Sequence, residues 1–517
     1  MKKTVIFHPF LLAIFPIIFL FSHNVNNIYA EEVILPLLYA ISGTFLIWIV
    51  LGFILKSRIK AGFVVSLGLI VFFSYGHIFM LLNTYFPMED IKQDFLSYHL
   101  ILFIPVLVLF AFGSYYFIRT KRPLNNATKI VNFIAASLVV ISFVGIGEYY
   151  ITESYSLNQI QNIPKESSVQ ITESNKFPDV YYIILDAYAG SLSLQKMENY
   201  DNSDFLDFLS KKGFHIASES FSNYQGTRFS IPSTLHMNYI QNTVDIKNID
   251  LTDGRALIEV SRDNPVFKNF KSKGYIIYSI ESGSVHTTNM NNVDFRLCTN
   301  EDTASQSEFD SLLIETTILN PIQTKLFSDA NREKILCGFS ELLHMKNNND
   351  TPKFVFAHIM LPHRPYVFGP TGEPIDSGSL ALRDDGIQKW NAEHYIGQLE
   401  FANLKMKELI EKLTETENSS IIIIQSDHGM RKGGYNNGYE FVLRNFNNFK
   451  AYNFPDGERN IDFETTTPVN SFRILFNLLG DEHDLLEDKL YVVSKEGDQF
   501  KDVTEARKKP NPSNLLD

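Results

Sequence analysis

The segment Val180 to Asp186 reads VYYIILD, an unbroken run of β-branched, aromatic and aliphatic residues that follows Pro178 closely and ends in a carboxylate. A strand that is apolar at every position is typical of a sheet covered on both faces, because a half-exposed strand would alternate apolar and polar residues. The run therefore predicts a central strand with Asp186 at its carboxyl end.

The same pattern recurs along the chain and alternates with helical segments. Further strand candidates are FHIA (214–217), YIIYSI (275–280), KFVFAHIM (353–360) and SIIIIQSDHG (420–429), and helix candidates are NSDFLDFLSKKG (202–213), NPVFKNFKSKG (264–274) and YIGQLEFANLKMKELIEKL (395–413). Alternating helices and short apolar strands predict an α/β domain with a doubly wound, mainly parallel sheet.

The carboxyl ends of these strands carry the residues best suited to chemistry, and ligands of such sheets bind there. The candidates are Asp186, His358, His363, Asp427 and His428. Each alone fits a helix cap, a packed side chain or a surface residue. Carboxylates and imidazoles that converge on one sheet edge instead form a divalent metal site, and nitrogen donors favour Zn²⁺ or Mn²⁺ over Ca²⁺.

The stretch Ser222 to Thr234, SNYQGTRFSIPST, offers a nucleophile to such a metal. Local helix rules favour Ser230 as an N-cap, because Pro232 would then fall in the first turn. Thr227 follows Gly226, which permits close approach to a ligand, and metal coordination would activate its hydroxyl. These local rules alone do not choose the nucleophile.

The first third of the chain holds five apolar runs, most of them long enough to span a bilayer. We predict five transmembrane helices, at about Thr4–Phe21, Val33–Leu55, Phe63–Leu82, Leu100–Ile118 and Ile130–Gly147. The first run also fits, loosely, a cleaved signal peptide with a small residue at Ala30.

The loop charges orient these spans. Lys and Arg gather before the first run, after the second and between the fourth and fifth, whereas Glu31, Glu32, Glu89 and Asp90 occupy the other loops. Since basic loops stay in the cytoplasm, the chain after about Tyr150 should lie on the outer face of the cell membrane. We therefore expect a membrane region at 1–150, a polar linker at 151–176, a catalytic domain at 177–492 and a disordered tail at 493–517.

Charge and cysteine content narrow the partners and the compartment. A formal net charge of -12 argues against a nucleic-acid partner, which requires a basic face. Cys298 and Cys337 lie in the exported part, where they could form one disulfide or equally stay unpaired.

The order of the motifs YYIILDAY, NYQGTRFSIPSTL, FAHIMLPHRPY and IIIIQSDHG resembles the membrane-bound, sulfatase-like branch of the alkaline phosphatase superfamily. It is similar to lipid A phosphoethanolamine transferases and, more distantly, to lipoteichoic acid synthases, which also place an exported hydrolase-like domain after five spans. The resemblance covers the layout of the membrane region and the motifs from about Phe177 to Gly480.

The resemblance implies a role for each matching residue. Thr227 stands three positions before a Ser-x-Pro element, as the nucleophile of the transferases does. The implied metal ligands are Asp186, Thr227, Asp427 and His428; His363 would act as acid or base, and His358, Arg228 and Arg364 would bind substrate. The two arginines could equally be solvated residues beside the motifs.

Two departures from the family pattern limit the substrate. The transferases carry a further His about a dozen residues after Asp-His-Gly, where this chain reads YNNGYEF (435–441), which puts a phosphoethanolamine donor in doubt. Sulfatases need an Arg where this chain has Thr234, so sulfatase activity is not expected.

Three functions follow. The leading hypothesis is a metal-dependent transferase that moves a phospholipid head group to a surface glycan or lipid through a Thr227 intermediate. A membrane-anchored hydrolase, either a phosphodiesterase or a sulfuric ester hydrolase, would use the same groups with water as acceptor. An inactive, sulfatase-like binding protein would have lost metal ligands, and all core positions are present.

Overall fold

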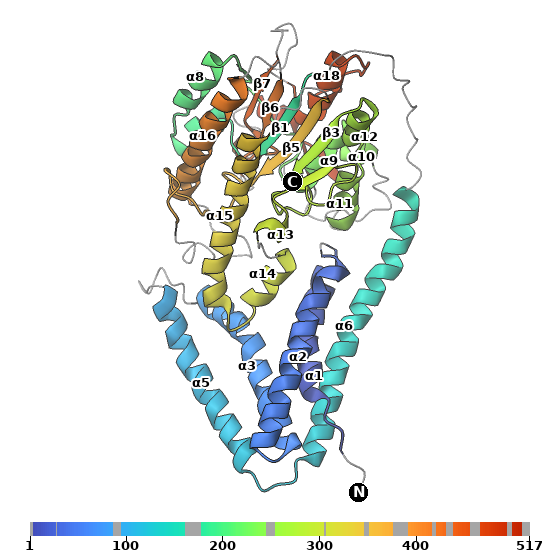
Figure 1. Ribbon diagram of the computed structural model, residues 1–517, viewed down its shortest axis with the longest axis vertical. Coiled ribbons are helices and arrows are strands. Elements are labelled where there is room, and N and C mark those ends of the chain that lie inside the picture. The colour runs from blue at the N-terminus through green and yellow to red at the C-terminus, as the bar shows by residue number, and fades with distance from the viewer. Residues whose placement is uncertain are drawn as a thin grey trace. The chain divides into compact units, whose positions relative to one another are not determined.

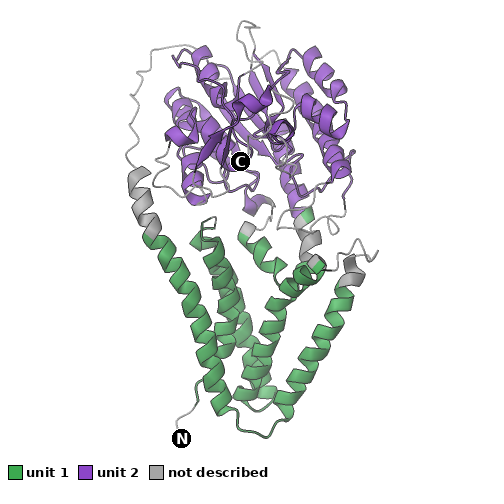
Figure 2. Cartoon of the chain, turned by 180° about the vertical axis from the view of Figure 1, so that it is seen from behind, with its two compact units in different colours: residues 1–156, 306–328, 376–389 green, residues 157–305, 329–375, 390–517 purple. Residues whose placement is uncertain are grey.

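The computed structural model describes residues 4–26, 28–85, 95–160, 177–243, 254–303, 307–345, 351–375, 391–415, 420–430, 438–454, 466–493 and 499–508. The chain divides into two compact units, which Figure 2 colours separately. Unit 1 comprises residues 1–156, 306–328 and 376–389, and unit 2 comprises residues 157–305, 329–375 and 390–517. Glu89, Asp90 and most of the predicted linker, residues 161–176, lie outside the described residues.

Unit 1 is built from apolar helices at the five predicted places. They are α1 (His8–Asn24), α2 (Ala30–Ile54), α3 (Arg58–Tyr85), α5 (Phe95–Arg119) and α6 (Asn125–Ile160), whose last residues belong to unit 2. By length and composition, four of them could cross a membrane: α2, α3, α5 and α6.

The prediction of five spans is therefore wrong by one among the described residues. Helix α1 is apolar but has 17 residues, which at 1.5 Å per residue is about 26 Å, less than the roughly 30 Å of a bilayer core. It begins only at His8, where Pro9 occupies the first turn, and so starts later than the apolar run predicted from Thr4.

A segment from the predicted catalytic domain packs in unit 1. Helix α14 (Glu308–Glu315) buries Phe309 and Leu313 in one apolar cluster with residues of α1, α2 and α3, including Phe73. Backbone hydrogen bonds continue this contact: the Ile318 N–H donates to the Phe72 carbonyl at 2.9 Å, and the Gly76 N–H donates to the Thr316 carbonyl at 3.0 Å.

Unit 2 contains a seven-stranded sheet in the order β2-β7-β6-β1-β5-β3-β4. The strands are β1 (Val180–Leu185), β2 (His215–Ile216), β3 (Ile276–Ile280), β4 (Phe295–Leu297), β5 (Lys353–Ile359), β6 (Ile421–Gln425) and β7 (Lys450–Asn453). The pairs β1–β5, β1–β6, β3–β5 and β3–β4 are parallel, whereas β7 pairs antiparallel with both β6 and β2. The predicted mainly parallel sheet is thus confirmed, with β1 at its centre.

Helices cover both faces of this sheet, as Figure 1 shows. One face carries α9 (Thr227–His236), α11 (Gly254–Arg262), α12 (Pro265–Ser272) and α18 (Ser471–Leu478), and the other carries α8 (Ser203–Lys211), α15 (Asn320–His344) and α16 (Ala392–Thr414). Tyr182 and Phe356 pack with Phe267 and Phe472 in the core of the first face. Every residue of β1 is buried, which explains its unbroken apolar run.

The remaining elements complete unit 2. They are α7 (Ser191–Glu198), α10 (Ile240–Thr243), α13 (Asn300–Thr303), α17 (Gly438–Phe446), the 3-10 helices η3 (Pro468–Asn470) and η4 (Thr504–Arg507), and the antiparallel pair β8 (Tyr491–Val493) and β9 (Phe500–Asp502). Cys298 and Cys337, whose pairing the sequence leaves open, form a disulfide that links the end of β4 to α15.

The C-terminal stretch 499–508 is ordered, although it lies in the tail that the sequence predicts to be disordered. Strand β9 pairs with β8, and the apolar side chains of Val503 and Ala506 are buried beside α17. The prediction of disorder follows from the many charged residues of this segment and does not take these two apolar positions into account. Residues 509–517 lie outside the described part of the chain.

Gly76 provides a test of the contact between α3 and the 307–320 segment. A Cβ at Gly76 would lie 2.0 Å from the Glu315 carbonyl oxygen and 2.6 Å from the Thr316 carbonyl carbon, which are backbone atoms that cannot rotate away. We expect Gly76→Ala to destabilise the protein by about 1–3 kcal/mol, as overpacking does. The measurement is the fraction of full-length protein that stays monodisperse in detergent after heating. Gly43→Ala on α2, where a Cβ meets nothing within 4 Å, is the matched control, and equal losses for both variants would contradict the contact.

Candidate active site

The parallel strands bring three of the predicted residues together at their carboxyl ends. Asp186 follows β1, His358 lies near the end of β5 opposite Ile184, and Asp427 follows β6 after Ser426. One ligand atom from each of Asp186, His358 and Asp427 lies within 4.8 Å of the others, and all three side chains are buried. The sheet rule thus predicted this cluster from the sequence.

Each of the two carboxylates in this cluster has one oxygen with no hydrogen-bond partner among the described residues. In Asp427, Oδ1 accepts hydrogen bonds from the backbone N–H groups of Ala187 (3.2 Å) and His428 (3.0 Å), but Oδ2 has none. Asp186 Oδ1 likewise has none. Buried charged oxygens left in this way are costly unless a cation meets them, so the donor set fits a divalent metal.

His428 presents a nitrogen to these oxygens. Its Nδ1 lies 2.6 Å from the Gly429 carbonyl oxygen, so this nitrogen carries the proton and Nε2 keeps its lone pair. Nε2 lies 3.4 Å from Asp427 Oδ2 and 3.5 Å from Asp186 Oδ1. Gly429 is required beside it, because a Cβ there would lie 2.6 Å from the Arg444 carbonyl oxygen. Three predicted ligands therefore face one another.

Thr227 lies next to this cluster and is half-buried. Its Oγ1 lies 3.4 Å from Asp186 Oδ2 and 3.3 Å from His428 Nε2. Thr227 is the first residue of the ten-residue helix α9, so its side chain lies at the positive end of the helix dipole.

The predicted cap at Ser230 is wrong. Helix α9 begins four residues earlier than a cap at Ser230 would place it, with Gly226 in the capping position and an extended backbone. The Ser230 hydroxyl is buried and donates to the Tyr224 carbonyl at 3.0 Å, which leaves it turned to the protein and not to the site. Pro232 consequently lies inside the helix and not in its first turn, where the prediction places it.

The charge state of Asp186 depends on its histidine neighbours. Burial raises the pKa of the Asp186 carboxyl, but His363, His358 and His428 together lower it well below its usual range. The carboxylate is therefore ionised at neutral pH and able to hold a cation. The rings of His363 and His428 are 6.3 Å apart between centroids, and Gln398 Nε2 fixes the His363 loop by donating to its backbone carbonyl at 2.7 Å.

The two predicted arginines have other neighbours in the structure. Arg228 lies over the ring of Phe229, with its Cζ 5.3 Å from the centroid. Arg364 is near Tyr366. Burial raises the pKa of Tyr366, and the charge of Arg364 opposes this rise by a smaller amount. A role in substrate binding remains a prediction for both.

The loop after β3 was missed by the sequence analysis, although it follows the carboxyl end of a predicted strand. It brings the hydroxyls of Ser282 and Thr287 against His358. It also brings His286 near the cluster, where burial and then the charge of Arg228 lower the pKa of His286 to about 3. The rule that selected Asp186 and Asp427 would have directed attention to this loop as well.

Comparisons with known proteins place these residues in a family context. The family model described as Sulfatase matches residues 178–470, which is more than half of the chain and contains the whole cluster. No curated protein sequence matches the chain significantly.

Solved structures of similar fold include both soluble domains and a membrane protein. The C-terminal periplasmic domain of EcEptC from Escherichia coli has a TM-score of 0.39 and 11% identity, covering 62% of this chain and 90% of that one. The integral membrane lipooligosaccharide phosphoethanolamine transferase A from Neisseria meningitidis has a TM-score of 0.38 and 13% identity, covering 91% and 95%. A protein in the alkaline phosphatase superfamily from Vibrio parahaemolyticus has a TM-score of 0.38 and 12% identity, covering 62% and 74%. At these scores and identities the likenesses carry no argument about activity.

Metal binding at the cluster should be visible as stabilisation of the full-length protein. We expect Zn²⁺ or Mn²⁺ at about 100 times its Kd to add about 2.7 kcal/mol of stability to chelator-treated protein, because only the folded state binds it. Asp427→Asn should abolish this gain, measured as the metal-induced shift in melting temperature. Asp179→Asn is the matched control, since Asp179 precedes β1 at the opposite end and pairs with Lys353 at 3.3 Å. If Asp427→Asn showed the same metal-induced shift in melting temperature as the wild type, the proposed metal site would be refuted.

Proposed function

The chain belongs to the sulfatase family, and from that premise we propose that it is a metal-dependent transferase of the cell envelope. It would move a lipid head group of phosphoethanolamine or phosphoglycerol type onto a surface glycan or lipid. The observation that carries the proposal is the position of one hydroxyl: Thr227 Oγ1 lies 3.4 Å from Asp186 Oδ2 and 3.3 Å from His428 Nε2, at the start of a helix.

Asp186, Asp427, His428 and Thr227 would hold the metal, for which Zn²⁺ or Mn²⁺ suits the mixed oxygen and nitrogen donors. When bound, this ion would supply Lewis-acid stabilisation of the charge that develops on the transferred group. The support for this assignment is the pair of buried carboxylate oxygens without hydrogen-bond partners among the described residues. His428 adds the lone pair of Nε2, since its Nδ1 proton is committed to the Gly429 carbonyl.

The proposed reaction has two balanced steps. First, Thr227 Oγ1 forms a bond to phosphorus while the bond from phosphorus to the lipid alcohol breaks, and the alcohol leaves with a proton. Then a hydroxyl of the acceptor attacks the same phosphorus, the bond to Thr227 breaks and the threonine hydroxyl regains a proton. His363 is the proposed acid and base for these proton transfers, because an imidazole titrates near neutral pH.

The phosphoryl oxygens of the substrate would meet the amino end of α9. The N–H groups of the first helical turn and the helix dipole both favour an anion at Thr227. Arg228 and Arg364 are proposed to add positive charge, Arg228 from the residue directly after the nucleophile. This arrangement suits a phosphodiester, whose negative charge increases in the transition state.

The membrane helices would bring the site to its donor. With α2, α3, α5 and α6 able to cross a bilayer, the chain is an integral membrane protein. The proposed orientation, with unit 2 outside, rests on the Lys and Arg in alternate loops. An anchored enzyme meets a lipid donor that is confined to two dimensions, which raises its effective concentration.

Three alternatives can be weighed against the transferase. A hydrolase would use the same residues with water in the second step. Thr227 is only half-buried, so water could reach it. A sulfatase is disfavoured, since Thr234, where sulfatases carry an Arg, is buried and donates to the Ser230 carbonyl at 2.8 Å. An inactive binding protein is disfavoured because the carboxylates, the imidazole and the nucleophile are all in place.

The nucleophile can be tested by intact mass. Exposure of the full-length protein to candidate phospholipid donors should leave a covalent adduct on the wild type, and the added mass would identify the transferred group. Thr227→Ala should lose the adduct completely, because no other hydroxyl replaces Oγ1. Ser230→Ala is the matched control and should keep it, since the Ser230 hydroxyl faces the Tyr224 carbonyl. An adduct that survives Thr227→Ala would exclude this residue as the nucleophile.

Transfer and hydrolysis can be separated by following labelled phospholipid. We expect the full-length protein to release the head group slowly alone and much faster with a cell-envelope fraction, where the label should appear on a glycan or lipid. The measurement is the distribution of label between water-soluble products and the envelope. Label that reaches only water in both reactions would favour the hydrolase over the transferase.

A further inference from the structure

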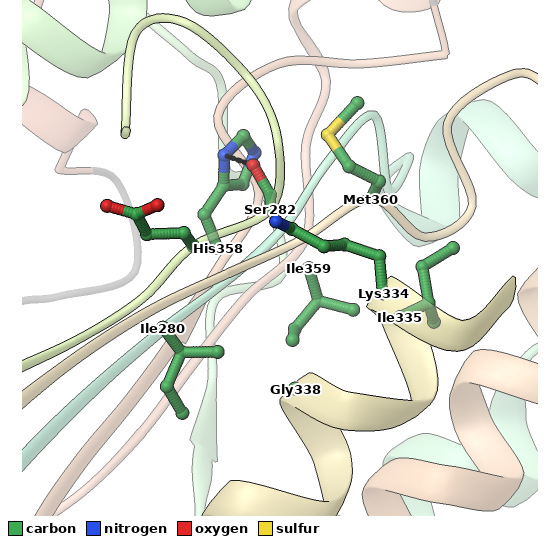
Figure 3. Close-up of a pocket in the computed structure, with 9 residues that line it drawn as sticks. Ile280, Ser282, Lys334, Ile335, Gly338, His358, Ile359 and Met360 are labelled. Atoms are coloured by element: carbon green, nitrogen blue, oxygen red, sulfur yellow. Dashed lines mark hydrogen bonds between the residues drawn. The ribbon is translucent and has the colours of Figure 1, made fainter. Parts of the chain in front are cut away.

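His358 is enclosed by polar partners on both sides of its ring and is fully buried. Its Nε2 lies 3.1 Å from Asp186 Oδ2. Its Nδ1 lies 2.9 Å from the Thr287 hydroxyl and 3.0 Å from the Ser282 hydroxyl, and Figure 3 shows the contact with Ser282. A ring in this position has no nitrogen left for a substrate, in contrast to the substrate contact that the family resemblance implies.

We propose that His358 is a positioning residue that holds Asp186 in the orientation needed to bind the metal, with Ser282 and Thr287 holding His358 in turn. The inference rests on the proposed function, because it concerns the same metal site. It extends that site to a line of contacts across three neighbouring strands, from the loop after β3 through β5 to the end of β1.

The two oxygens of Asp186 have different surroundings, which is the main support for this role. Oδ2 meets His358 at 3.1 Å, whereas Oδ1 has no hydrogen-bond partner among the described residues and lies 3.5 Å from His428 Nε2. The unpartnered Asp427 Oδ2 lies 3.4 Å from the same nitrogen. The free oxygens therefore gather around His428, and His358 is paired with the other oxygen of Asp186.

A hydrogen bond to one carboxylate oxygen fixes the rotation of the whole group. Without it, only the longer contact with Thr227 Oγ1, at 3.4 Å, would hold Oδ2. Asp186 could then turn about its terminal torsion, which is broad for a carboxylate, and the position of Oδ1 would no longer be fixed. The ionised Asp186 requires a donor at Nε2, so Nδ1 must accept, and the Ser282 and Thr287 hydroxyls are the donors that satisfy it. Partners of this kind commonly change metal affinity 10–100-fold, roughly, when they are removed.

The hydroxyls of Ser282 and Thr287 are packed against the rest of unit 2. Ser282 and His358 line a small cavity together with Lys334 of α15 and Met360 (Figure 3). The Lys334 ammonium donates to Asn300 Oδ1 at 2.8 Å, and the Ser282 and Thr287 hydroxyls lie 3.2 Å apart. Backbone hydrogen bonds tie the loop after β3 to its neighbours, as a support for His358 must be: the Glu281 N–H donates to the Leu297 carbonyl at 3.0 Å, and the Asn291 N–H donates to the Arg262 carbonyl at 3.0 Å.

The test is zinc affinity of the full-length protein in detergent, measured by competition with a chromogenic chelator. His358→Asn, whose amide is too short to reach Asp186, should weaken zinc binding about 10–100-fold. His358→Gln, which can still donate to Asp186, should recover part of the loss. Ser282→Ala combined with Thr287→Val should weaken binding in the same direction, although neither residue contacts Asp186.

Ser279→Ala is the matched control, because it removes a buried hydroxyl from β3 that has no hydrogen-bond partner among the described residues. Its zinc affinity should equal that of the wild type. In a His358→Asn background the Ser282 and Thr287 changes should have no further effect, since they act through the missing ring. X-ray absorption of the zinc-loaded protein should show as many nitrogen ligands in His358→Asn as in the wild type.

Three results would overturn the proposal: unchanged affinity in His358→Asn, full additivity of the hydroxyl changes in that background, or loss of a nitrogen ligand, which would make His358 a metal ligand itself. If His358→Asn does not fold, the hydroxyl variants compared with Ser279→Ala decide alone. A wild-type protein that binds no zinc at this site would instead refute the proposed function, so the two failures are distinguishable.

Discussion

Two carboxylates, Asp186 and Asp427, are buried close together at the carboxyl edge of the sheet. Each of them has one carboxylate oxygen with no hydrogen-bond partner among the described residues. Burying a charge in this way costs several kcal/mol unless a counter-charge is supplied. The proposed function would offset this cost, because the same oxygens, with His428, would form a preorganised site for a divalent cation. The turn after β1 is itself strained, since Ala187 has a φ of 60°.

The surrounding elements fix the positions of the side chains in this cluster. Backbone N–H groups fix one oxygen of Asp427, and the Gly429 carbonyl fixes the tautomer of His428. Parallel strands set the distance between the residues, since β1 pairs with both β5 and β6 and carries their carboxyl ends to one edge. Helix α9 then adds Thr227 and a positive helix end, so the proposed nucleophile and the proposed metal ligands come from three separate parts of the chain: the start of α9 and the ends of β1 and β6.

The sequence predicted the parts of this site that obey local rules. Apolar runs identified β1, β5 and β6, and their ends identified Asp186, His358, Asp427 and His428; the choice of Thr227 required the family resemblance. Other features depend on tertiary contacts that no local pattern encodes. Helix α9 begins at Thr227, ahead of the predicted cap at Ser230, whose hydroxyl donates to the Tyr224 carbonyl. The packing of α14 in unit 1, the disulfide and the contact of Ser282 and Thr287 with His358 join residues far apart in sequence.

In the proposed site, one divalent cation would lie between Asp186, Asp427 and His428, next to Thr227. The most direct measurement is anomalous diffraction at the zinc absorption edge from crystals of the zinc-loaded protein. We expect an anomalous peak within coordination distance of Asp186 Oδ1, Asp427 Oδ2 and His428 Nε2, roughly 2.0–2.2 Å from each. A zinc-loaded crystal with its peak elsewhere, or with these three atoms unliganded, would contradict it.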